Sequence, residues 1–179
     1  KAKRLSEVSR ISIAIPWIDY ELAYISYMDG SFRGACFYFR RSVESAIKED
    51  DKLAELSART LLGRQYCLNG DFRNSLECFD KADDLVNKMP ILQENDWADR
   101  QHINLLVHRA ELLYSQEKYA EATRSLNKAH ELSKAQNASW NFNIHYGLIA
   151  LKEQRYEAAI GELTSLFREY NEKGILGSQ

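Results

Sequence analysis

Turn-forming residues are scarce in this chain of 179 residues, which has 8 glycines and 2 prolines. An all-β sandwich or barrel needs such residues at regular intervals between its short strands. Long apolar runs are missing too, because the longest uncharged stretch near the start, residues 11–18, is far shorter than the ~20 residues that cross a bilayer. The sequence therefore predicts an all-α protein without membrane insertion.

A strong excess of one charge is also absent. The 24 Lys and Arg residues against 26 Asp and Glu residues leave a net charge of −2, which disfavours direct binding of nucleic acid or of anionic lipid. The three cysteines, Cys36, Cys67 and Cys78, form no CxxC pair, so neither a disulfide framework nor a zinc site is indicated. Three free thiols suit a reducing compartment, and we expect a cytoplasmic protein.

Patterns typical of catalysis or metal binding do not occur either. No two histidines stand at i, i+4, and no Cys or carboxylate lies beside them at ligand spacing. GxSxG, HExxH and phosphate-binding glycine loops are missing. The sequence thus predicts no catalytic residue, no metal site and no cofactor, and we expect a protein that is not an enzyme. The histidines themselves are interpreted as polar surface or groove residues: His102, His108, His130 and His145.

What the chain does have is one pattern repeated four times, in residues 22–42, 61–82, 109–129 and 146–166. Each copy contains a small residue, then a short polar turn, an aromatic residue and a second small residue. The first small residues are Ala23, Gly63, Ala110 and Gly147, the aromatics are Phe32, Phe72, Tyr119 and Tyr156, and the second small residues are Ala35, Ser75, Ala122 and Ala159. Small side chains allow two helices to cross closely, so each copy predicts a helix–turn–helix pair.

The pattern resembles the tetratricopeptide repeat (TPR), which starts with Leu-Gly-x2-Tyr and finishes with Ala-x3-Phe-x2-Ala. The resemblance covers roughly residues 16–170 and implies a right-handed α-α superhelix, a TPR-like solenoid, of four helix–turn–helix repeats. We expect repeats at approximately 16–50, 53–89, 97–136 and 140–173, and a separate N-terminal helix over Lys3–Ile15. A loop over Lys88–Asp96 should precede a helix that starts near Trp97. We expect one repeat domain over residues 1–179, cut from a longer protein.

The small residues of successive copies are 40, 47 and 37 residues apart, which is more than the ~34 residues of the minimal repeat. Lengthened repeats are similar to those of bacterial transcription-activator sensor domains, peptide-pheromone receptors and kinesin light chains. The resemblance implies a non-catalytic scaffold that binds a protein or peptide within a regulatory or assembly protein. The alternative is a ligand- or peptide-sensing domain of a signalling or transcription-regulator protein. The sequence indicates no oligomeric state.

In such an array the first helices line a concave groove, where partners usually lie. The partner-binding residues expected there are Trp17, Tyr20, Tyr24, Tyr27, Arg64, Asn104, His108, Glu111, Tyr114 and Asn141. The aromatic members have an alternative interpretation, in which they pack against the N-terminal helix or a missing repeat. The Lys, Asn and Arg side chains with which related proteins hold chaperone tails are replaced here except at Asn104, so a chaperone-tail adaptor is not expected.

A second surface is an alternative binding site for the partner. Residues 42–100 carry 8 basic and 13 acidic residues, and three of the acidic ones cluster on a predicted second helix. A solvated outer face is the default interpretation of such a cluster, and docking of a basic partner is the alternative. The cluster consists of Asp80, Asp83 and Asp84.

Overall fold

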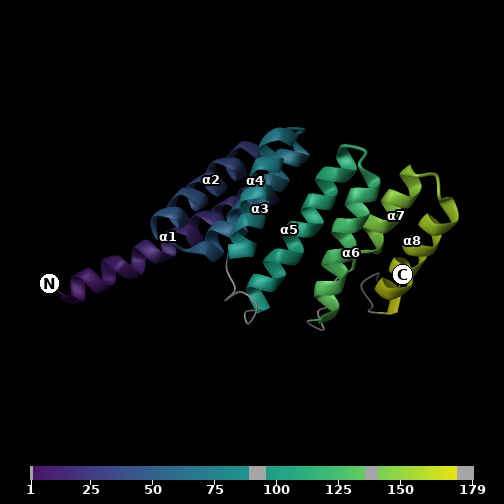
Figure 1. Cartoon of the computed structure of the whole chain (residues 1–179). Coiled ribbons are helices and arrows are strands. Elements are labelled where there is room, and N and C mark those ends of the chain that lie inside the picture. Colours follow the sequence, from purple (N-terminus) through teal and green to yellow (C-terminus); the bar gives the residue numbers. More distant parts are fainter. Residues whose placement is uncertain (1, 89–95, 136–140, 173–179) are drawn as a thin grey trace. The chain divides into compact units, whose positions relative to one another are not determined.

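The computed structural model describes the backbone of residues 2–88, 96–135 and 141–172, and for residues 2–13 and 96 it describes the backbone alone. These residues form eight helices and no strand (Figure 1), as the all-α prediction requires. The helices are α1 (Ala2–Met28), α2 (Phe32–Lys48), α3 (Lys52–Leu68), α4 (Phe72–Lys88), α5 (Asp96–Ser115), α6 (Tyr119–Ala135), α7 (Asn143–Lys152) and α8 (Tyr156–Glu172). None of the helices described has the length and hydropathy of a membrane span.

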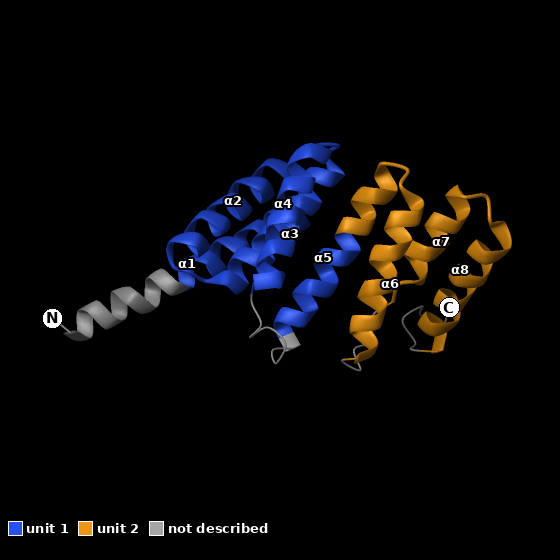
Figure 2. Ribbon diagram, viewed as in Figure 1, with its two compact units in different colours: residues 1–108 blue, residues 109–179 orange. Residues whose placement is uncertain are grey.

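Neighbouring helices pack in the order of the sequence. Helix α1 packs on α2, α2 on α3 and α3 on α4, while α6 packs on α7 and α7 on α8. The chain divides into two compact units, Lys1–His108 and Arg109–Gln179 (Figure 2), and the border falls within α5. Helix α5 begins beside Trp97, as predicted, whereas the loop predicted over Lys88–Asp96 lies, apart from its two ends, outside the described residues.

The turn inside every helix pair has the same backbone structure. After α1, the N–H of Gly30 donates to the carbonyl of Tyr27 at 3.0 Å and the N–H of Ser31 donates to that of Ser26 at 2.8 Å. Both bonds recur at the corresponding atoms after α3, α5 and α7, and they define a Schellman motif with a left-handed residue at C′. The C′ residues with positive φ are Gly30 (72°), Gly70 (77°), Glu117 (61°) and Gln154 (60°).

Two of these turns place a non-glycine residue in the left-handed region, so Glu117→Gly and Gln154→Gly should each stabilise the protein. The Cβ of an L-residue costs about 1–2 kcal/mol there, and glycine's larger loss of chain entropy offsets part of the gain. We expect each substitution to raise the free energy of unfolding in urea by about 0.5–1 kcal/mol. As a control, Lys128→Gly on the exposed side of α6 should cost about 1 kcal/mol. Equal losses in all three variants would contradict the turn geometry.

The small residues lie at close helix crossings, as the repeat pattern predicts. All eight are buried. A Cβ built on Gly63 of α3 would lie 2.7 Å from Cε1 of Phe79 on α4, and one built on Gly147 of α7 would lie 2.9 Å from Cγ of Leu163 on α8. The two glycines thus have the same role in two helix pairs, which confirms the alignment of these copies.

The prediction of a separate N-terminal helix is wrong. Helix α1 is continuous from Ala2 to Met28, and it runs through Pro16 where we expected a break. A proline inside a helix removes one hydrogen bond and costs about 3 kcal/mol. Here Pro16 is fully buried, and its carbonyl accepts a hydrogen bond from the hydroxyl of Ser42 on α2 at 2.7 Å. Packing against α2 offsets the cost, so the first helix pair begins with a longer helix than predicted.

Candidate functional site

Three of the predicted partner-binding residues meet on α1 and α3. Nη1 of Arg64 donates to the hydroxyl of Tyr27 at 3.0 Å, and the guanidinium carbon lies 5.5 Å from the centroid of the same ring. The ring of Tyr24, one turn earlier on α1, has its centroid 6.2 Å from that of Tyr27 and is exposed. We call Tyr24, Tyr27 and Arg64 the tyrosine–arginine cluster. It joins two first helices, α1 and α3, which contact each other directly.

Tyr20, which we also predicted to face a partner, instead packs in the core. Its ring meets that of Phe39 on α2 edge-on, with centroids 5.8 Å apart. Burial, then the nearby Glu21 carboxylate and Tyr24, raise the pKa of Tyr20 to about 12, so its phenol stays protonated at neutral pH. This side chain therefore packs within the α1–α2 pair.

Trp17 is tied to the turn between α2 and α3. Its Nε1–H donates to Oδ2 of Asp51 at 2.9 Å, and Oδ1 of Asp51 accepts the backbone N–H of Ala54 at 2.9 Å, which caps the start of α3. The indole also meets the rings of Tyr20 and Trp97 edge-on, with centroids 5.9 and 6.3 Å away. The predicted aromatic set therefore divides between core packing and the tyrosine–arginine cluster.

In the second unit, Glu111 on α5 meets His145 on α7. Nε2 of His145 lies 3.5 Å from Oε1 of Glu111, and both side chains are partly buried. Nδ1 of His145 is buried without a hydrogen-bond partner among the described residues. Tyr114 packs on the ring of Tyr119 across the turn, with centroids 5.8 Å apart. Two first helices thus meet here as well, through a polar pair.

The remaining predicted residues are Asn104, His108 and Asn141. Asn104 and His108 are partly buried on α5. Oδ1 of Asn141 accepts the N–H of Asn143, the first residue of α7, at 3.0 Å, while its amide donates to the Glu169 carboxylate on α8. Asn141 thus joins the start of α7 to α8.

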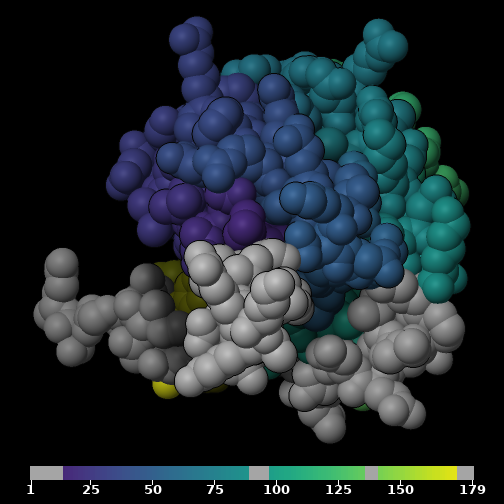
Figure 3. Space-filling view, turned by 90° about the vertical axis from the view of Figure 1, so that its left-hand side faces the viewer, coloured from purple at the N-terminus to yellow at the C-terminus, as the bar shows by residue number. Residues whose placement is uncertain are grey.

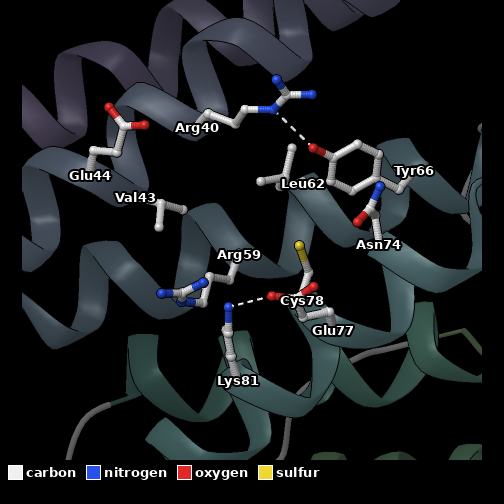
Figure 4. Close-up of a pocket in the computed structure, with 10 residues that line it drawn as sticks. All are labelled: Arg40, Val43, Glu44, Arg59, Leu62, Tyr66, Asn74, Glu77, Cys78 and Lys81. Carbon is white, nitrogen blue, oxygen red and sulfur yellow. Dashed lines mark hydrogen bonds and ion pairs between the residues drawn. The ribbon is translucent and has the colours of Figure 1, made fainter.

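A cavity of about 210 Å³ lies on α2, α3 and α4, on a side that the sequence analysis did not consider (Figure 4). Nε of Arg40 donates to the hydroxyl of Tyr66 at 2.9 Å, and Lys81 pairs with Glu77 and lowers its pKa. Sequence reasoning missed this cavity because three helices contribute to it. Its walls consist of Arg40, Val43, Glu44, Arg59, Leu62, Tyr66, Asn74, Glu77, Cys78 and Lys81.

The cavity offers no reactive nucleophile from its cysteine. Burial raises the pKa of Cys78 to about 11, so the thiol is protonated at neutral pH. All three cysteines are free, as predicted, and buried. Within the described ranges, no group of three or more His, Cys, Asp or Glu side chains is arranged to hold a metal ion.

The chain matches none of the protein-family models, curated proteins and solved structures with which we compared it. The resemblance to the tetratricopeptide repeat therefore rests on the residue pattern alone.

Proposed function

We propose that this chain is a non-catalytic module that binds a protein or peptide, built from TPR-like helix pairs in a right-handed superhelix and belonging to a cytoplasmic regulatory or assembly protein. The observation that carries the proposal is the tyrosine–arginine cluster. It combines an exposed tyrosine, a second tyrosine and an arginine on two first helices that touch. Tyrosine and arginine are enriched among the residues that dominate binding energy at protein interfaces.

The contacts between first helices support this choice of surface. In the first unit, α1 meets α3 through Tyr27 and Arg64, and in the second unit α5 meets α7 through Glu111 and His145. Each of these contacts joins helices that are two apart in the chain. Such contacts are what a wall built of successive first helices requires, because the second helices then lie on the other side.

The cluster is also prepared for binding. Arg64 is held by the hydroxyl and the ring face of Tyr27, so docking a partner immobilises few additional rotamers. The guanidinium suits a carboxylate or a backbone carbonyl of the partner, and the exposed ring of Tyr24 adds apolar contact area. The chemistry fits a peptide that carries an acidic side chain next to an apolar one.

Peptides selected from a displayed random library against the folded chain test this proposal. Arg64→Ala and Tyr24→Ala should each lower the affinity of the chain for the selected peptides by about 5- to 100-fold. This change corresponds to about 1–3 kcal/mol of binding free energy. The matched control is Arg40→Ala, because Arg40 bonds the hydroxyl of Tyr66 and stacks on its ring at 5.7 Å in the same way, but at the cavity. Affinity measured by calorimetry should be unchanged in this variant.

Two results would contradict the proposed surface. Binding that is lost in Arg40→Ala and kept in Arg64→Ala would place the partner at the cavity. Binding that survives both substitutions and is lost when Asp80, Asp83 and Asp84 are changed to Asn would place it on the acidic face of α4.

A structural feature in favour of the sensing alternative is the cavity on α2, α3 and α4. At about 210 Å³ it is smaller than the roughly 300–1,000 Å³ of usual small-molecule sites. Arg59 and Lys81 in its walls are already paired with the carboxylates of Glu55 and Glu77. A small anion would compete with these carboxylates, so we favour binding of a protein or peptide.

A further inference from the structure

Each second helix whose junction is described receives the following first helix on a defined face. At the α2–α3 junction, Leu62 lies in one buried cluster with Cys36 and Phe39. At the α6–α7 junction, the rings of Phe142 and Tyr146 lie 5.2 and 6.4 Å from that of His130. The Tyr146 hydroxyl also donates to Asn127 at 2.8 Å. On the first helices the same position of the pattern is used in both junctions, because Leu62 and Tyr146 each stand one residue before the small residue.

Helix α8 carries this receiving face in an exposed and apolar form. When the second helices are aligned on their opening aromatic residues, Phe167 corresponds to Val43 of α2 and to His130 of α6. Val43 is 7% exposed and Phe167 is 61% exposed. We call the stripe of exposed apolar residues the α8 face, which consists of Tyr156, Ile160, Leu163, Phe167 and Tyr170.

Helix α1 carries the matching docking face, also exposed. When the first helices are aligned on their small residues, Ile18 corresponds to Ala58 of α3 and to Phe142, the residue directly before α7, and both of these are buried. Ile18 is 53% exposed, and atoms of the described part of α1 are visible at the surface beside α2 in Figure 3 (purple and blue). We call this stripe the α1 face, which consists of Ile15, Ile18, Leu22, Ile25 and Met28.

We propose that the α1 face of one copy of this chain docks on the α8 face of a second copy. The contact would reproduce between copies the junction that α2 and α3, or α6 and α7, form within one copy. A second copy is the occupant because this one polypeptide presents both halves of the junction, each apolar and each exposed among the described residues. This inference goes beyond the proposed binding function, since neither face includes the tyrosine–arginine cluster.

The two docking faces differ, so the contact is head to tail and leaves one unused face at each end of a dimer. Further copies can add at both ends, and the assembly grows without a fixed size unless it closes into a ring. One helix on one helix is a small interface compared with the roughly 1,600 Å² of a standard one. We therefore expect weak association, with a dissociation constant of about 10–500 μM.

Two charge-bearing variants test the pairing. One carries Ile18→Glu and Ile25→Glu on the α1 face, and the other carries Ile160→Glu and Phe167→Glu on the α8 face, all at exposed positions. In sedimentation equilibrium, the average mass of the unchanged chain should rise with concentration past that of a dimer. Each variant alone should stay monomeric, while their equimolar mixture should form dimers and stop there. Ile47→Glu, at an exposed isoleucine of α2, is the control and should associate like the unchanged chain.

Three results would overturn the proposal. The first is an unchanged chain that is monomeric at about 1 mM, which is above the whole expected range of the dissociation constant. The second is an α1-face variant that still dimerises alone, which would indicate a symmetric contact between two α8 faces. The third is an equimolar mixture that forms no dimer although far-ultraviolet circular dichroism shows both variants to be folded.

Discussion

Gly63→Leu is expected to lower the free energy of unfolding by about 3 kcal/mol or more, a large share of the roughly 5–15 kcal/mol of a typical domain. Even the first added carbon would lie 2.7, 2.9 and 3.1 Å from three atoms of the Phe79 ring. That ring is fully buried between helices and has no free direction in which to move. Urea unfolding followed by circular dichroism at 222 nm measures the loss of stability. Gly63→Ala should lower the free energy of unfolding by about 1–3 kcal/mol.

Gly147→Ala provides the matched comparison. Its added carbon would meet Leu163 at 2.9 Å, but Leu163 is 39% exposed and has room to turn towards solvent. We therefore expect a smaller loss than for Gly63→Ala. Phe79→Leu should lower the free energy of unfolding less in the Gly63→Ala variant than in the unchanged chain. The smaller leucine side chain partly relieves the clash with the Cβ added at position 63. Equal losses at the two glycines would show that Phe79 is free to move.

Asp51→Ala should lower the free energy of unfolding by about 2–3 kcal/mol, since it removes a helix cap and a charged hydrogen bond together. One carboxylate oxygen accepts the N–H of Ala54, and the other accepts the indole N–H of Trp17, both at 2.9 Å. The side chain thus joins the start of α3 to α1. Urea unfolding measures the loss, and the near-ultraviolet circular dichroism of the folded variant should change because Trp17 loses its anchor.

Asp71→Ala is the comparison for a cap whose described hydrogen bonds stay within one helix. Asp71 occupies the corresponding place before α4, where its carboxylate accepts the backbone N–H of Asn74 at 3.2 Å and the side-chain amide of Asn74 at 2.6 Å. Its removal should cost about 1 kcal/mol. If Asp51→Ala costs no more than that, the bond to Trp17 contributes nothing to stability and Asp51 acts only as a helix cap.

The helix pairs could be predicted from the sequence because their determinants are local. A small residue such as Gly63 allows a crossing only where the partner helix returns directly, and a short polar turn ensures that return. Pro16 misled the prediction, since its cost is offset by burial against α2 and by Ser42, which a local pattern does not reveal. The left-handed backbone at Glu117 was also missed, because a glutamate rarely signals a turn of this kind.

The candidate site was predictable only in part. Helical spacing placed Tyr20, Tyr24 and Tyr27 on one side of a first helix, but the crossing of α1 and α2 decides which ring is buried. Tyr20 contacts Phe39, whereas Tyr24 stays exposed. The pairing of Tyr27 with Arg64 joins residues 37 positions apart and depends on the packing of α1 on α3. The cavity is lined by residues of three helices, α2, α3 and α4. The spacing of residues along any one of these helices therefore does not predict it.

The recurring turns also have a consequence for the rate of folding. Each Schellman motif closes with bonds between residues a few positions apart, and the helix packing within each unit joins mainly neighbours in the chain. The mean sequence separation of contacting residues is therefore small, and little loop entropy has to be lost before the first native contacts form. A helix pair of either unit is thus able to serve as a nucleus from which its neighbours fold.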